Sequence, residues 1–210
     1  DGGPVYFWDT WIDDRQLHVM SVPVSGGDPS NLTLGTGFEL PRTAVQLDSP
    51  LYDIAPDGKE LAFVADSNPA ANVVNLDVFT VPVGGNAAVN RTSSSKASDT
   101  VPLYSPDGRW LAWGQQRIVG FYGDIKRLML LDRRSGAERQ VVDEAWDRSA
   151  EGLAWAPNSK HLYGAIDDAG SVRVYEFPLE GKPRAITGDE TFSSLAVAAD
   201  SGTLVGLRQT

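Results

Sequence analysis

Short apolar runs of strand length alternate with polar turns along this chain, and one arrangement of them recurs. The clearest copy, residues 103–113, reads Leu-Tyr-Ser-Pro-Asp-Gly-Arg-Trp-Leu-Ala-Trp. Proline presets φ at the first corner of a turn, aspartate can bond its own backbone, and glycine accepts a positive φ. The pattern therefore predicts a β-hairpin with its turn at Asp107 and Gly108.

The same hairpin pattern occurs at four other places. Residues 51–64 are nearly a copy, 153–165 carry Asn-Ser at the turn, 195–207 are fainter, and 1–7 resemble a copy without its first strand. The Asp or Asn residues that mark the turns are spaced by 56, 50, 51 and 42 residues, at Asp1, Asp57, Asp107, Asn158 and Asp200. A period of this size indicates propeller blades or solenoid turns.

The first four copies along the chain are each followed by a third apolar segment, a glycine-rich turn and a short fourth segment. The third segments are 18–24, 77–83, 127–133 and 173–179, and the fourth are 31–33, 89–92, 139–142 and 184–187. Four antiparallel strands in a repeat of about 40–50 residues are typical of a β-propeller blade. The sequence therefore predicts an all-β chain without helices.

The blade pattern also gives boundaries. We predict an incomplete blade at 1–48, complete blades at 49–98, 99–149 and 150–190, and the opening hairpin of a further blade at 191–210. Propellers usually close with about 4–8 blades, so this chain should be an open arc of about four blades from a larger propeller of about seven or eight. The native protein is then expected to continue beyond both ends.

Composition and charge narrow the function classes. The net charge of −10 and the lack of any Lys/Arg cluster longer than two residues argue against a nucleic-acid-binding groove. The chain has no cysteine, which excludes disulfides and thiolate metal sites. No apolar run approaches the roughly 20 residues of a membrane-spanning helix.

Candidate catalytic chemistry is sparse. There is no Gly-x-Ser-x-Gly motif, and the two histidines, His18 and His161, are expected on strand surfaces. The adjacent carboxylates at Asp13-Asp14 and Asp167-Asp168 would need further oxygen ligands at fixed offsets to form a calcium loop. The glycosylation-like triplets at Asn31 and Asn90 fall where fourth strands are expected. We therefore predict no catalytic residue, no cofactor and no metal in this chain.

The repeated Ser-Pro-Asp-Gly-x-x-Leu-Ala pattern resembles the blades of Tol-system and peptidase propellers. A longer match is more specific. Residues 105–113, 127–136, 146–149 and 155–160 resemble the propeller of dipeptidyl aminopeptidases and acylaminoacyl-peptidases, which belong to the prolyl oligopeptidase family of serine peptidases. Residues 195–208 are similar to the last blade before the hydrolase domain of that family.

This resemblance implies a periplasmic or cytoplasmic exopeptidase whose α/β-hydrolase domain, with its Ser, Asp and His, follows Thr210. The propeller would cap the active site, gate the access of peptides and contact its own hydrolase domain. Relatives tend to read Gly-Tyr-Glu-Ser-Asp in a loop that contacts substrate, where this chain has Gly-Phe-Tyr-Gly-Asp at 120–124. Phe121, Tyr122 and Asp124 are therefore the substrate-side candidates, although the family's glutamate is replaced here.

The repeats alone leave an alternative open. A non-catalytic, TolB-like propeller that binds a protein partner would show the same blades. The two hypotheses differ in whether a Gly-x-Ser-x-Gly motif follows Thr210. An open arc also leaves blade faces unpaired, so self-association into a homo-oligomer is compatible with either hypothesis.

Overall fold

The computed structural model describes residues 17–33, 38, 40, 51–68, 73–85 and 87–209. These residues form sixteen strands and no helix. Consequently no helix in the described ranges is long and apolar enough to cross a membrane. The expectations for Asp1 and for the pair Asp13-Asp14 lie outside the described residues.

Three antiparallel sheets have four strands each, and in each one the strands follow the order of the chain. The first contains β3 (Tyr52–Ile54), β4 (Glu60–Asp66), β5 (Leu76–Pro82) and β6 (Val89–Asn90). The second contains β7 (Asp99–Tyr104), β8 (Trp110–Gln115), β9 (Arg127–Asp132) and β10 (Glu138–Gln140). The third contains β11 (Ala154–Trp155), β12 (His161–Asp168), β13 (Ser171–Pro178) and β14 (Arg184–Ala185).

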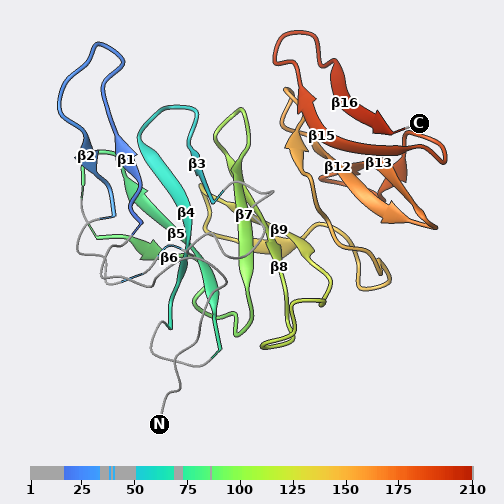
Figure 1. Cartoon of the computed structure of the whole chain (residues 1–210), viewed down its shortest axis with the longest axis horizontal. Helices are drawn as coiled ribbons and strands as arrows, with labels where there is room; N and C mark the ends of the chain where they lie inside the picture. Colours follow the sequence, from blue (N-terminus) through green and yellow to red (C-terminus); the bar gives the residue numbers. More distant parts are fainter. Residues whose placement is uncertain are drawn as a thin grey trace.

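Two smaller sheets flank these three. β1 (Met20–Ser21) pairs with β2 (Ser30–Asn31) before them, and β15 (Thr191–Val197) pairs with β16 (Leu204–Gln209) after them. Figure 1 shows the sheets following one another along the chain in an open arrangement. The prediction of an all-β fold of four-stranded antiparallel blades is confirmed, and we refer to the three complete sheets as blades 2, 3 and 4.

The hairpin turns have the chemistry that the sequence predicts. Gly58 and Gly108 have φ of +70° and +68°. Asp57 and Asp107 each accept, at 3.0 Å, the backbone N–H two residues further on. In blade 4 the glycine position is occupied by Ser159, which has φ of +57° and accepts a hydrogen bond from the Asp107 N–H at 3.0 Å. This turn therefore also links blade 4 to blade 3.

Three apolar cores lie between successive sheets, from the β1–β2 sheet to blade 4. Phe63 and Phe79 of blade 2 pack with residues of the β1–β2 region, and Trp113 and Leu111 of blade 3 pack against blade 2. The largest cluster joins blades 3 and 4 and includes Phe177. Because blades 2 and 3 bury apolar side chains on both faces, their strands are stabilised mainly by the neighbouring sheets.

In three repeats a threonine after the fourth strand forms a hydrogen bond to the backbone of the third segment. Thr33, Thr92 and Thr187 each accept, through Oγ1, the N–H of a residue at the start of the third strand, at 2.9–3.2 Å. Asn31 and Asn90 in turn accept the N–H of that threonine at 2.9 Å. The Asn-x-Thr triplets are thus explained by a local turn that fixes the strand edge.

Candidate functional site

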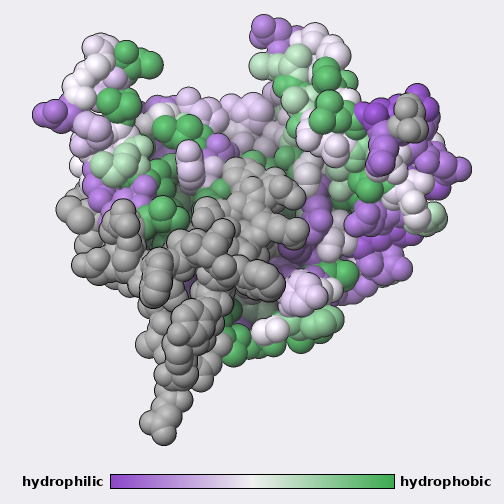
Figure 2. Space-filling model, viewed as in Figure 1, coloured by the Kyte–Doolittle hydropathy of each residue, from purple (hydrophilic) through white to green (hydrophobic). Residues whose placement is uncertain are grey.

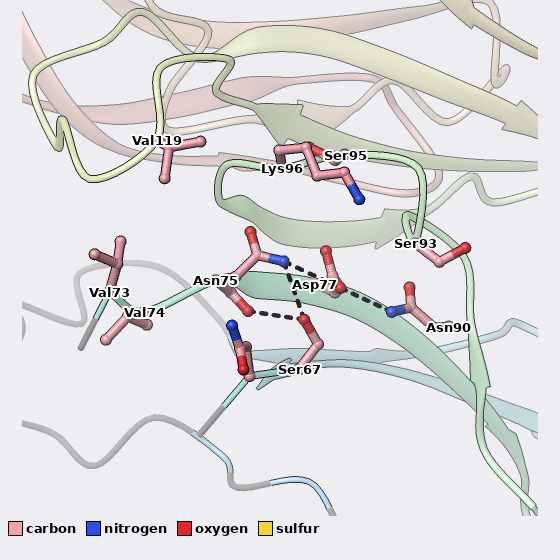
Figure 3. Close-up of a pocket in the computed structure, with 11 residues that line it drawn as sticks. Ser67, Val73, Val74, Asn75, Asp77, Asn90, Ser93, Ser95, Lys96 and Val119 are labelled. Carbon is pink, nitrogen blue, oxygen red and sulfur yellow. Dashed lines mark hydrogen bonds between the residues drawn. The ribbon is translucent and has the colours of Figure 1, made fainter. Parts of the chain in front are cut away.

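A pocket of about 390 Å³ opens where loops of blades 2 and 3 meet (Figure 3). Three connections form it: the β4–β5 loop, the β8–β9 loop and the β6–β7 crossover. These connections lie at the strand ends opposite the Asp-Gly turns, because each follows a second or fourth strand. The lining residues are Ser67, Asn68, Val73, Val74, Asn75, Asp77, Asn90, Ser93, Ser95, Lys96 and Val119.

The polar side of the pocket is organised around Asp77, which is only 2% exposed. Its carboxylate accepts hydrogen bonds from Asn90 Nδ2 at 2.7 Å, from Thr92 Oγ1 at 3.2 Å and from Asn75 Nδ2 at 3.5 Å. Asn75 Nδ2 also donates to Ser67 Oγ at 3.0 Å. In the described part of the chain Asp77 forms no ion pair, so its charge is held by neutral donors alone.

A second buried carboxylate belongs to Asp99, the first residue of β7 in blade 3. It is fully buried, accepts the indole N–H of Trp113 at 2.9 Å, and leaves its other oxygen without a donor. Burial raises the pKa of Asp99 to about 7, and the charge of Asp77 adds to this effect. Two residues further on, Val101 has φ of +59° at an irregularity in the β7–β8 register, which is uncommon for a β-branched residue.

The β8–β9 loop is held from inside by two buried side chains. Asp124 accepts the N–H groups of Arg117 at 2.6 Å and of Ile118 at 3.0 Å. Gln116 Nε2 donates to the carbonyls of Tyr122 and Asp124 at 3.0 and 2.8 Å. Burial tends to raise the pKa of Asp124, but these two N–H groups and the Arg127 guanidinium together hold it below its ordinary value.

The three residues singled out from the sequence are therefore placed differently. Phe121 is 52% exposed and Tyr122 is 94% exposed, so both are accessible from solvent. The Asp124 carboxylate lies under the loop and positions it. The substrate-side role of the three stays a prediction. Sequence reasoning missed the pocket residues Asn75 and Asp77, which an alignment of the repeats with one another would have marked as unusual.

The two histidines have local partners. His18 Nδ1 lies 3.1 Å from Thr33 Oγ1, and His161 Nε2 lies 3.0 Å from the hydroxyl of Tyr163 and 3.4 Å from Glu176. Asp168 is paired with Arg148 and Arg173 (Nη–Oδ distances of 2.8 and 3.1 Å) and accepts the hydroxyl of Tyr175. Within the described ranges, no cluster of three or more His, Cys, Asp or Glu residues could hold a metal ion.

Similar proteins were found that match nearly the whole chain. No protein-family model matches it. Dipeptidyl-peptidase 5 of Aspergillus fumigatus is 26% identical over 96% of this chain, and the chain spans 31% of the length of that relative. A puromycin-hydrolyzing peptidase from Mycobacterium tuberculosis covers 91% of the chain with a TM-score of 0.64 at 20% identity, over 32% of its own length.

TolB from Acinetobacter baumannii has a similar fold. It covers 91% of this chain and 48% of its own, with a TM-score of 0.58 at 14% identity. Identities this low show a shared fold alone, whereas the sequence match to dipeptidyl-peptidase 5 extends over nearly the whole chain. This chain is therefore homologous to the propeller region of dipeptidyl-peptidase 5, in agreement with its resemblance to the prolyl oligopeptidase family.

Proposed function

We propose that this chain is the gating propeller of a serine exopeptidase of the dipeptidyl-peptidase type. The observation that carries the proposal is the match to dipeptidyl-peptidase 5 over 96% of the chain. In this proposal the catalytic Ser, Asp and His belong to an α/β-hydrolase domain outside these 210 residues. The propeller covers that active site and admits short or extended peptides in preference to folded proteins.

The loop face of blades 2 and 3 is the surface we assign to this role. It combines exposed aromatic side chains at Phe121 and Tyr122 with the pocket of about 390 Å³ next to them. The loop is fixed from inside by Gln116 and Asp124, so it presents its outer side chains in a defined geometry. Such preorganised loops on a rigid scaffold are common binding sites.

The test uses the full-length product of the native gene. A fluorophosphonate probe should label one serine, and intact mass should show a chain far larger than the 22.6 kDa of this one. Gating is measured separately, by comparing the release of the same dipeptide from a short unstructured peptide and from the N-terminus of a folded carrier protein. We expect faster release from the small substrate, because a folded carrier cannot enter a site that the propeller covers. Equal rates on the two substrates would refute the gating role.

A second candidate is a TolB-like propeller that binds a protein partner without catalysis. It is favoured by the structural match to TolB, which covers a larger share of that protein than of the peptidases. An unlabelled gene product of propeller size that co-purifies with one stoichiometric protein would support this candidate and contradict the peptidase proposal.

A further inference from the structure

The internal repeats place equivalent residues at the same point of each blade, where the third strand begins. The backbone bond from the fourth strand fixes this alignment, since the carbonyls of Val19, Val78, Leu128 and Val174 accept equivalent N–H groups. The residue before each of these therefore occupies an equivalent position in each repeat. These residues are His18, Asp77, Arg127 and Arg173.

In blades 3 and 4 an arginine at this point is paired with a carboxylate, in the β8–β9 loop of blade 3 and at the end of β12 in blade 4. Arg127 lies 3.4 Å from Asp124, and Arg173 lies 3.1 Å from Asp168. In both blades the arginine and the carboxylate therefore neutralise each other. Asp77 in blade 2 reverses the sign of the charge, and within the described residues no cation lies within ion-pair distance of it. The end of blade 2 borders the pocket of about 390 Å³.

The opposite charge is present in the same pocket but is not paired. Lys96, on the β6–β7 crossover, lines the pocket together with Asp77, and its ammonium forms no ion pair with any described residue. Figure 3 shows Lys96 extending over the pocket from the crossover, with Asp77 on the strand beneath. Asn75 adds a buried Oδ1 that receives no donor. The pocket thus offers separate sites for a cationic and an anionic group.

The remaining wall is apolar. Val73 and Val74 on the β4–β5 loop are exposed on one side of the pocket, and Val119 of the β8–β9 loop lies across from them (Figure 3). A ligand that satisfies all three features has an ammonium, a carboxylate and an aliphatic side chain. A volume of about 390 Å³ accommodates one or two amino-acid residues but no folded partner.

We propose that this pocket binds a small zwitterion, a free amino acid or dipeptide with an aliphatic side chain, its ammonium on Asp77 and Asn75 and its carboxylate on Lys96. The site lies on the loop face between blades 2 and 3. A dipeptide in this place would be the type of product that the proposed peptidase releases, and to that extent the inference rests on the proposed function.

The test is isothermal titration calorimetry on the full-length protein with four probes: Val-Val, N-acetyl-Val-Val, Val-Val-amide and free valine. Val-Val should bind, and blocking either end should weaken binding about tenfold or more, since each removes a charge-assisted hydrogen bond. Free valine binding as tightly as Val-Val would assign the pocket to single amino acids, whereas tighter binding of Val-Val assigns it to dipeptides. Both outcomes support a zwitterion site.

Two variants separate this pocket from a peptidase active site that also binds dipeptides. Asp77→Asn should remove the preference for a free amino end, and Lys96→Met should remove the preference for a free carboxyl end. Lys96 is exposed, so Lys96→Met remains informative if Asp77→Asn does not fold. The matched control is Asp167→Asn, an exposed carboxylate in blade 4 that should change nothing.

Unchanged Val-Val affinity in Lys96→Met, or equal binding of free and blocked peptides, would overturn the inference. This readout does not depend on catalysis. Failure of the peptidase proposal would instead appear as the absence of fluorophosphonate labelling, whatever the titrations show, so the two proposals fail separately.

Discussion

The indole N–H of Trp113 donates to Oδ1 of Asp99 at 2.9 Å, and both side chains are completely buried. This bond joins β8 to β7 in blade 3, next to the register irregularity at Val101. The other oxygen of Asp99 receives no hydrogen bond. A buried carboxylate with one orphan oxygen is more stable when it carries a proton.

The first prediction concerns pH. The pKa of Asp99 is about 7 in the folded protein and 3.8 without the fold, so the folded state binds the proton more tightly. The stabilisation is present below the lower value and is lost as pH rises through the folded value. The melting temperature should therefore fall by about 4 °C or more between about pH 5 and pH 8. Differential scanning fluorimetry measures it.

Asp99→Asn is the variant that isolates this effect, because it keeps an acceptor for Trp113 and cannot ionise. The variant should melt above the wild type at about pH 8 and lose this advantage at about pH 5. A wild-type pH dependence that survives in the variant would show that another group is responsible.

The second prediction concerns the contact between blades 2 and 3. Glu60 accepts the hydroxyl of Tyr104 at 2.7 Å and pairs with Arg133 at 2.9 Å, and both partners belong to blade 3. Glu60→Ala leaves the Tyr104 hydroxyl without its acceptor and removes one of the two acceptors of the Arg133 guanidinium, so it should destabilise the protein by about 1–3 kcal/mol. Tyr104→Phe should cost less, about 1 kcal/mol. Urea unfolding measures both, and Tyr52→Phe, at an exposed tyrosine, is the neutral control.

The third prediction concerns the loop from 116 to 124. Asp124→Asn loses the charge that holds the N–H groups of Arg117 and Ile118, and Gln116→Ala removes the donor to three loop carbonyls. Both variants should loosen the loop, and trypsin should cleave after Arg117 about tenfold faster, because protection from proteolysis follows local stability. Mass spectrometry of the first fragments identifies the site. Cleavage that begins elsewhere in both variants would contradict the assigned role of these side chains.

The fourth prediction tests the substrate-side candidates by kinetics. Phe121→Ala and Tyr122→Ala remove exposed aromatic surface and should leave the melting temperature unchanged. If the loop contacts peptide substrates as proposed, KM should rise about threefold to tenfold with little change in kcat, since uniform binding is lost. Val205→Ala, at another exposed apolar side chain, is the control. Unaltered KM in both loop variants would remove the loop from the binding surface.

Local turn chemistry made most of the fold predictable. The Asp-Gly pairs at 57–58 and 107–108 specify tight hairpins, and their spacing specifies the blade repeat. The irregularity at Val101 was not predictable, because a β-branched residue disfavours positive φ and only the packing around it maintains that conformation.

The candidate site was predictable only in part. The exposed positions of Phe121 and Tyr122 follow from an insertion between the second and third strands. The burial of Asp124 does not follow, because its partners are backbone N–H groups, which no sequence pattern displays. The pocket around Asp77 depends on side chains from three connections, and their meeting is a property of the assembled blades.

The hydrogen bonds between blades 2 and 3 are unevenly distributed along their strands, and this has a mechanical consequence. In the described residues they join Asp53 to the Tyr104 N–H and Glu60 to Tyr104 and Arg133, all at or toward the Asp-Gly turns. The opposite ends carry the pocket. A tilt of one blade against the other would therefore have its axis near the Asp-Gly turns. The blades would separate more at the pocket than at the turns.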